Sequence, residues 1–300
     1  MSPAARPADP CHAIKDPTVV FHDGRWRLFC TIRSARRTHQ IEYLSFTDWE
    51  QADQADRHVL AIEPGYFCAP QVFYFRPHRK WYLIFQTSDE SRQPSLQPAY
   101  STSDNLEDPQ AWTKPALLFA EPPVIKAWID FWVICDSEQA HLFFTSLDGR
   151  MWRSATPLDK FPHGWSTPEV ALEADLFEAS HTYRLTGVDR FLTVIEAQAE
   201  GRRYYKAYLA DRLAGPWRPL ADSVERPFAG RANVGFKGPA WTDSISHGEL
   251  LRAANDETLP VDPKNLRFLF QGVSDQERAG KDYGQIPWRL GLLEPTVTAE

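Results

Sequence analysis

The order of short apolar segments along this chain repeats itself, and this repeat constrains the fold more than any other feature. In each of four successive units, two strand-like segments flank a polar turn, as 17–21 and 25–29 do around "HDG". Aromatic and β-branched residues bounded by such turns are typical of β-hairpins. The other three hairpins pair 70–75 with 80–85, 131–135 with 140–146, and 181–185 with 190–196.

A third strand-like segment follows each hairpin, and a tryptophan in a loop-like setting comes next. A fifth and less regular copy spans 247–253, 266–272 and 287–293, with the long turn "NDETLPVDPKN" inside it. The third segments and their tryptophans are 41–46 with Trp49, 99–103 with Trp112, 150–155 with Trp165, and 203–209 with Trp217.

Five such units, at a period of about 45 to 70 residues, predict an all-β fold, a five-bladed β-propeller. No helix of consequence is expected, and the recurring tryptophans are expected to pack between blades. Since a blade cannot bury both of its faces alone, residues 1–300 are expected to form one catalytic domain, with 1–12 as a flexible N-terminal segment. The alternative fold, a β-sandwich, would not require a fivefold repeat.

Charge and hydropathy limit the partners. The net charge of −7 and the lack of a Lys and Arg cluster argue against nucleic acid. No apolar run reaches the length of about 18 residues that a membrane helix needs, so no membrane partner is expected. The four cysteines form no C-x-x-C pair, which argues against a zinc or redox motif. A monomer is expected.

Polar residues stand where the first strand of each unit begins. The innermost strands of a propeller line its central channel, so these side chains should converge at one end of that channel. Burying a polar group without a partner costs about 2 to 7 kcal/mol, and an uncompensated carboxylate costs more. Buried polar residues at these positions therefore indicate a functional role. The residues are Asp16 with its neighbour Lys15, then Gln71, Asp130, Glu178 and His247.

Paired carboxylates in a partly dry pocket suit glycosidic hydrolysis, which needs a protonated acid and an ionised base. Ten segments, in order over 13–293, resemble glycoside hydrolase family 62, the arabinoxylan α-L-arabinofuranosidases. The segments are "AIKDPTVV", "FTDW", "PGYFCAPQVFYF", "WYLIFQT", "IDFWVICD", "LFEAS", "GRRYYKAY", "AGPW", "ISHGE" and "PWRLGLL".

The resemblance implies an inverting mechanism. Asp16 corresponds to the general base and Glu178 to the general acid, while Asp130 corresponds to the carboxylate that tunes and orients the acid. Lys15 is expected to contact the arabinose, and His247 resembles a ligand of a channel Ca²⁺ ion held mainly by water. Secondary candidates for substrate contacts are Gln71, Arg203, Asn233 and Tyr283.

The implied substrate is arabinoxylan or an arabinoxylo-oligosaccharide. Such a polymer substrate leads us to expect a secreted protein, yet "MSPAARPADPCHA" shows no signal peptide, so the location stays open. One departure from the family pattern is Gly284, where an Asn that contacts xylan is common. The segment "TIRSARRTHQ" (31–40) is unusually basic and is expected at the rim of the site.

Other interpretations of these residues stay open at this point. A related propeller, an arabinanase or β-xylosidase, would share the three carboxylates, and a propeller that only binds sugar would not need them. Asp16 alone reads as a turn residue before Pro17, and His247 as a core histidine without metal. Arg203 could simply pair with acids in the pocket wall, and Glu196 is expected to be the structural partner of an arginine.

Overall fold

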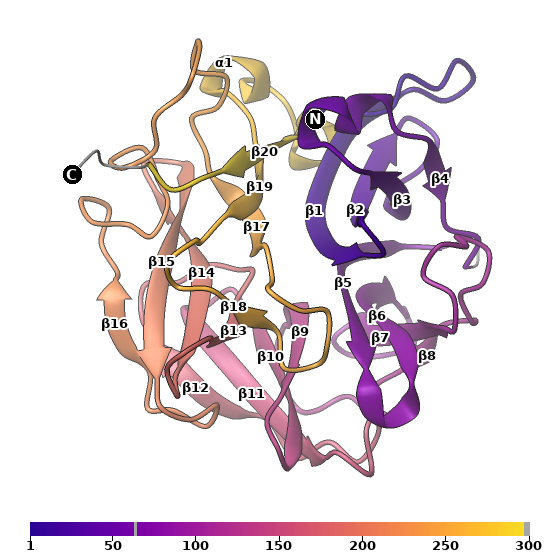
Figure 1. Ribbon diagram of the computed structural model, residues 1–300, viewed down its shortest axis with the longest axis vertical. Coiled ribbons are helices and arrows are strands. Elements are labelled where there is room, and N and C mark those ends of the chain that lie inside the picture. Colours follow the sequence, from indigo (N-terminus) through magenta and orange to yellow (C-terminus); the bar gives the residue numbers. More distant parts are fainter. Residues whose placement is uncertain (63–64, 297–300) are drawn as a thin grey trace.

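Five β-sheets follow one another around a common centre in the computed structural model of the protein, which describes residues 1–62 and 65–296 (Figure 1). The predicted five-bladed β-propeller is confirmed, and each blade is built from sheet strands that run in chain order from the channel outward. Blade 1 comprises β1 (Cys11–His22), β2 (Arg25–Ser34), β3 (Gln40–Phe46) and β4 (Arg57–Val59), and blade 2 comprises β5 (Phe67–Phe75), β6 (Lys80–Ser88), β7 (Leu96–Ser103) and β8 (Ala116–Leu117).

The other three blades follow the same plan, except that blade 5 has three strands in the described part of the chain and the sheet of blade 4 gains a short strand, Pro260–Val261, beside its innermost strand. Helices are short: α1 (Asp275–Arg278) and the 3₁₀ turns η1 (Trp49–Gln54), η2 (Arg76–His78) and η3 (Tyr283–Gln285). Blade 3 holds β9 (Ile129–Cys135), β10 (Gln139–Thr145), β11 (Arg150–Pro157) and β12 (Glu169–Glu173); blade 4 holds β13 (His181–Leu185), β14 (Phe191–Ala199), β15 (Arg202–Ala210) and β16 (Arg218–Ala221); blade 5 holds β17 (Ser246–Leu250), β19 (Phe268–Gly272) and β20 (Arg289–Leu293).

Aromatic side chains hold neighbouring blades together. Trp112 of blade 2 meets Phe29 of blade 1 edge to face at 5.6 Å between ring centroids, and Trp217 of blade 4 meets Phe143 of blade 3 at 6.0 Å. Both tryptophans are buried. Aromatic pairs of this kind stabilise a core beyond the burial of their area, and the expected packing of tryptophans between blades is confirmed at these two positions.

The first and last blades meet beside the N-terminal segment. The backbone N–H of Ile14 donates to Trp288 O at 3.1 Å, and β1 packs beside β17, β19 and β20. The amino group of Met1 donates to Leu290 O at 2.7 Å, and Leu290 N donates back to Met1 O at 2.9 Å. These contacts attach Met1 to the outermost strand of blade 5, and β1 already begins at Cys11. Both ends of the segment 1–12, which was expected to be flexible, therefore contact the sheets.

The segment between β17 and β19, residues 251–267, contacts the innermost strands of all four other blades, and we call it the closing loop (Figure 1). It includes β18 (Pro260–Val261), which pairs in parallel with the end of β13. The sequence indicated only a long turn here. The contacts are Arg252 Nη2 to Val19 O at 3.0 Å, Tyr74 N to Asn255 O at 2.7 Å, Cys135 N to Glu257 O at 2.8 Å, and Arg184 N to Leu259 O at 3.2 Å.

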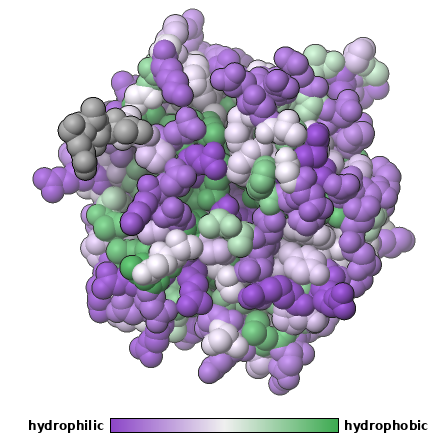
Figure 2. Space-filling view, viewed as in Figure 1, coloured by the Kyte–Doolittle hydropathy of each residue, from purple (hydrophilic) through white to green (hydrophobic). Residues whose placement is uncertain are grey.

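Hydrophilic side chains cover most of the face shown in Figure 2. The described residues include no helix with the length and hydropathy to cross a membrane. The four cysteines are free thiols; Cys30, Cys68 and Cys135 are buried, and Cys11 is half-buried.

Candidate active site

The innermost strands of blades 1, 2, 3 and 5 are each interrupted at an equivalent place by a residue in the left-handed backbone region, and in blade 4 such a residue lies just before β13. Strand pairing shifts register there, between Lys15 and Thr18 in β1, for example, so the interruption is a β-bulge. Such bulges re-aim side chains, and positive φ outside glycine costs about 1–3 kcal/mol that the surrounding fold must offset. The five residues are Asp16 (φ 48°), Ala69 (φ 50°), Asp130 (φ 58°), Ala179 (φ 52°) and His247 (φ 20°).

Asp16 lies inside β1, which corrects the expectation that it precedes the first strand. The strand begins at Cys11, and the bulge turns the carboxyl group of Asp16 into the channel while leaving the residue only 3% exposed. Its Oδ2 is 3.5 Å from Lys15 Nζ. Burial alone would raise the pKa of Asp16, but the charges of Lys15 and His247 and a hydrogen bond from Thr31 outweigh it, so the pKa is lowered. The carboxylate is therefore held ionised.

His247 lies between two carboxylates from other blades. Its Nδ1 is 3.4 Å from Asp16 Oδ1 and 3.9 Å from Asp130 Oδ2. Asp130 Oδ2 also accepts a hydrogen bond from Ala179 N at 3.0 Å, which connects it to the residue after Glu178. Burial and the nearby charge of Asp16 raise the pKa of Asp130, although His247 opposes them. Blades 1, 3, 4 and 5 thus meet at one point, as the sequence indicated.

Glu178 has the opposite pKa shift from Asp16. Burial contributes most, and the carboxylates of Glu196 and Asp130 add to it, so the pKa of Glu178 is raised well above its usual range even though Arg203 opposes them. Arg203 Nη1 donates to Glu178 Oε1 at 2.8 Å. A carboxyl group whose proton is retained in this way can act as an acid near neutral pH.

Glu196 is fully buried and holds two parts of the site together. One oxygen pairs with Arg203, which confirms the sequence-based interpretation of Glu196 as the partner of an arginine. The other oxygen accepts hydrogen bonds from Ser246 Oγ at 2.9 Å and from His247 N at 2.7 Å. This second role was missed, because the sequence contains no signal that places β14 against β17.

The secondary candidates separate into two groups. Arg203 and Tyr283 join the carboxylates: the Tyr283 hydroxyl is 3.3 Å from Lys15 Nζ, and the residue as a whole is 48% exposed. The side chain of Gln71 exchanges two hydrogen bonds of 2.7 Å with the backbone of Val133 and so links blades 2 and 3.

Asn233 has a local role in its own loop. Its Oδ1 accepts from Gly230 N at 2.9 Å, and its Nδ2 donates to Pro227 O and Phe228 O at 3.0 Å each. The structure therefore does not bring the Asn233 amide to the carboxylates. The presence of a polar residue in a segment that resembles the family does not show whether its side chain contacts substrate or stabilises a loop.

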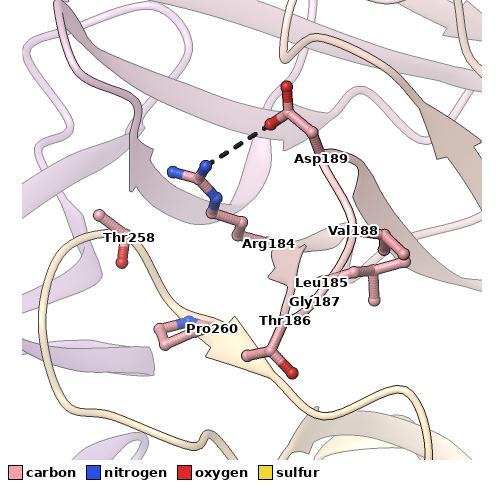
Figure 3. Close-up of a pocket in the computed structure, with 8 residues that line it drawn as sticks. All are labelled: Arg184, Leu185, Thr186, Gly187, Val188, Asp189, Thr258 and Pro260. Carbon is pink, nitrogen blue, oxygen red and sulfur yellow. Dashed lines mark ion pairs between the residues drawn. The ribbon is translucent and has the colours of Figure 1, made fainter.

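A surface pocket lies elsewhere, at the opposite end of the inner strands (Figure 3). It lies between the turn after β13 and the closing loop, and an ion pair of 3.5 Å joins Arg184 to Asp189 across it. None of the residues that the sequence predicted for the site lines it. The lining residues are Arg184, Leu185, Thr186, Gly187, Val188, Asp189, Thr258 and Pro260.

An ionised carboxylate and a protonated one, brought to the same end of a propeller channel from different blades, define a class of protein: glycoside hydrolases that work by general acid and base catalysis. The profile of glycosyl hydrolase family 62 matches residues 2–294, and the chain belongs to this family.

Known proteins that resemble the chain agree with this assignment. The catalytic domain of the Coprinopsis cinerea GH62 α-L-arabinofuranosidase is 41% identical, with a TM-score of 0.91 over 98% of this chain and 94% of that one. The arabinofuranosidase PaAbf62A of Podospora anserina, solved with cellotriose, is 36% identical, with a TM-score of 0.89 over 98% and 93%. α-L-Arabinofuranosidase C of Cellvibrio japonicus is 40% identical over 94% of this chain, which spans 44% of that relative's length.

Proposed function

We propose that the protein is an inverting α-L-arabinofuranosidase that removes arabinofuranosyl side chains from arabinoxylan or arabinoxylo-oligosaccharides. One observation carries this proposal: the pKa of Asp16 is lowered and that of Glu178 is raised in the same buried site. Family membership and the similarity to arabinofuranosidases support the choice of sugar. Opposite pKa shifts identify a base and an acid more specifically than an acidic cluster alone does.

In the proposed reaction, Asp16 accepts a proton from a water molecule while that water attacks the anomeric carbon of the arabinofuranosyl group. Glu178 donates its proton to the departing xylosyl oxygen, so the glycosidic bond breaks and the configuration inverts. Lys15 keeps Asp16 ionised and, in this proposal, contacts the arabinose. Glu196 and Asp130 keep the proton on Glu178 by like-charge repulsion.

The released sugar tests the proposal. Incubation with wheat arabinoxylan should yield free arabinose, and NMR of the first product should show the anomeric configuration opposite to that of the bound sugar. Xylose or arabino-oligosaccharides released from linear substrates would instead support a propeller of the arabinanase or β-xylosidase kind. A protein that binds the polymer without releasing sugar would be a binding module.

We also propose a structural Ca²⁺ ion near His247. No group of three or more His, Cys, Asp or Glu residues in 1–62 and 65–296 is arranged to hold a metal ion. One imidazole beside the carboxylates of Asp16 and Asp130 therefore fits only an ion whose ligands are mainly water, a weak kind of calcium site. When bound, the ion would add positive charge at the end of the channel, and no step of the reaction above requires it.

A further inference from the structure

Gly284 lies beside the active site, and Arg33 occupies the space that a side chain at position 284 would need. A methyl group added to Gly284 would lie 2.6 Å from Arg33 Nη1 and 2.9 Å from Nη2, closer than a carbon and a nitrogen that are not bonded approach. Gly284 is not one of the residues with positive φ. The glycine at 284 therefore provides space for the guanidinium and is not required by an unusual backbone conformation.

Among the residues that the structure describes, the guanidinium of Arg33 has no hydrogen-bond acceptor. Arg33 belongs to β2 and is half-buried. Its Nε is buried without a hydrogen-bond partner, and no carboxylate among the residues that the structure describes pairs with it. Buried donors in proteins are nearly always satisfied, and a guanidinium carries five N–H groups. Such a half-buried cation is available to a ligand.

Arg33 also lies at the mouth of the site. Gly284 directly follows Tyr283, whose hydroxyl reaches Lys15 and whose ring is half-exposed. Burial, together with the charges of Lys15 and then Arg33, lowers the pKa of His39 to about 3. The two cations therefore lie close to the same imidazole. Asp16, Asp130 and Glu178 are all more deeply buried than Tyr283.

We propose that Arg33 is a specificity-determining residue that donates hydrogen bonds to the leaving-group sugar chain at the mouth of the site. This inference rests on the proposed function, because the buried carboxylates then enclose the arabinosyl group and leave the xylosyl units outside the pocket. The planar fork of a guanidinium can bind two neighbouring oxygens at once. Beside it, the exposed ring of Tyr283 offers an apolar surface to the same sugar chain.

The experiment compares Arg33→Ala, Gly284→Ala and the control Arg36→Ala, which removes an exposed cation from the same segment. Gly284→Ala displaces the guanidinium but keeps its charge. Calorimetry would measure the Kd of linear xylotriose, and competition assays would measure inhibition by free arabinose. Both test variants should weaken xylotriose binding about tenfold, since a charge-assisted hydrogen bond is lost. Arabinose inhibition and the Arg36→Ala protein should stay within twofold of wild type.

Unchanged xylotriose affinity in Arg33→Ala and Gly284→Ala would overturn the inference, and so would an equal loss of xylotriose and arabinose affinity, which would place Arg33 in the arabinose pocket. Kinetics on an arabinoxylo-oligosaccharide give a second readout: KM should rise while kcat stays near wild type. A wild-type protein that binds xylotriose through Arg33 but releases no arabinose would refute the proposed reaction and leave the role of Arg33 intact.

Discussion

The two ends of the channel are built in opposite ways. At one end, three residues on left-handed backbone meet, with His247 Nδ1 at 3.4 Å from Asp16 Oδ1 and 3.9 Å from Asp130 Oδ2. At the other, backbone groups of the closing loop pair with the inner strands of blades 2, 3 and 4, and the side chain of Arg252 donates to the inner strand of blade 1. The strained, charged end is tolerated because the opposite end joins the five blades.

The largest effect on activity is expected when the acid or the base at the charged end is replaced. Glu178→Gln and Asp16→Asn should each lower kcat by a factor of at least about 100, because proton transfer is lost. The urea midpoint of unfolding should change little for Glu178→Gln, which replaces a protonated acid with an uncharged amide of similar shape. Asp16→Asn should lower the midpoint, because the folded surroundings lower the pKa of Asp16 and so stabilise its charged form. Glu200→Gln, at an exposed position, is the control for both measurements. A variant with turnover within a few-fold of wild type would lose its assigned role.

A change in the closing loop should have the reverse effect. Glu257 is buried and accepts hydrogen bonds from Arg76 N at 3.0 Å and from Arg76 Nε at 2.9 Å. Glu257→Ala should lower the free energy of unfolding by about 2 kcal/mol, the scale for hydrogen bonds that involve a charged group. Urea unfolding followed by circular dichroism would measure this change, with exposed Glu121→Ala as the control. If kcat falls as well, the two ends are not independent.

A smaller effect is expected on the pH dependence of activity. The lowered pKa of Asp16 keeps the base ionised until the solution is strongly acidic, and the raised pKa of Glu178 sets the alkaline limb of kcat/KM. Glu196→Gln removes a negative neighbour of Glu178, so the alkaline limb should move to lower pH by about one unit. The acidic limb should stay in place. An unmoved alkaline limb would show that Glu196 does not control the acid.

The proposed calcium ion should have the smallest effect. Chelation with EDTA should lower Tm by about 2–4 °C, equivalent to roughly 1 kcal/mol for a chain of this size, and added Ca²⁺ should restore it. His247→Gln should lose this response. If EDTA leaves the Tm of the wild-type protein unchanged, no calcium ion stabilises the channel.

The repeat predicted the ring well, because period-two strands and turn residues are local signals that each blade carries. The convergence of Asp16, Asp130, Glu178 and His247 followed from that ring by symmetry alone. The bulges could not be predicted, since nothing in Asp16 or Asp130 as residue types requires positive φ. The link that Gln71 makes between blades 2 and 3 and the contacts of the closing loop were not predicted for a related reason: their partners, Val133 and the four inner strands, are distant in the sequence.

The five left-handed positions have a consequence for how such a site could diversify. Each blade presents one backbone position that directs a side chain toward a shared space, so the chemistry depends on which residue each blade carries there and not on the scaffold. Ala69 of blade 2 and Ala179 of blade 4 bring no functional group at this position, and blade 4 supplies its acid from the preceding residue, Glu178. A ring of this kind could acquire a different set of reactive groups through single substitutions, with its architecture unaltered.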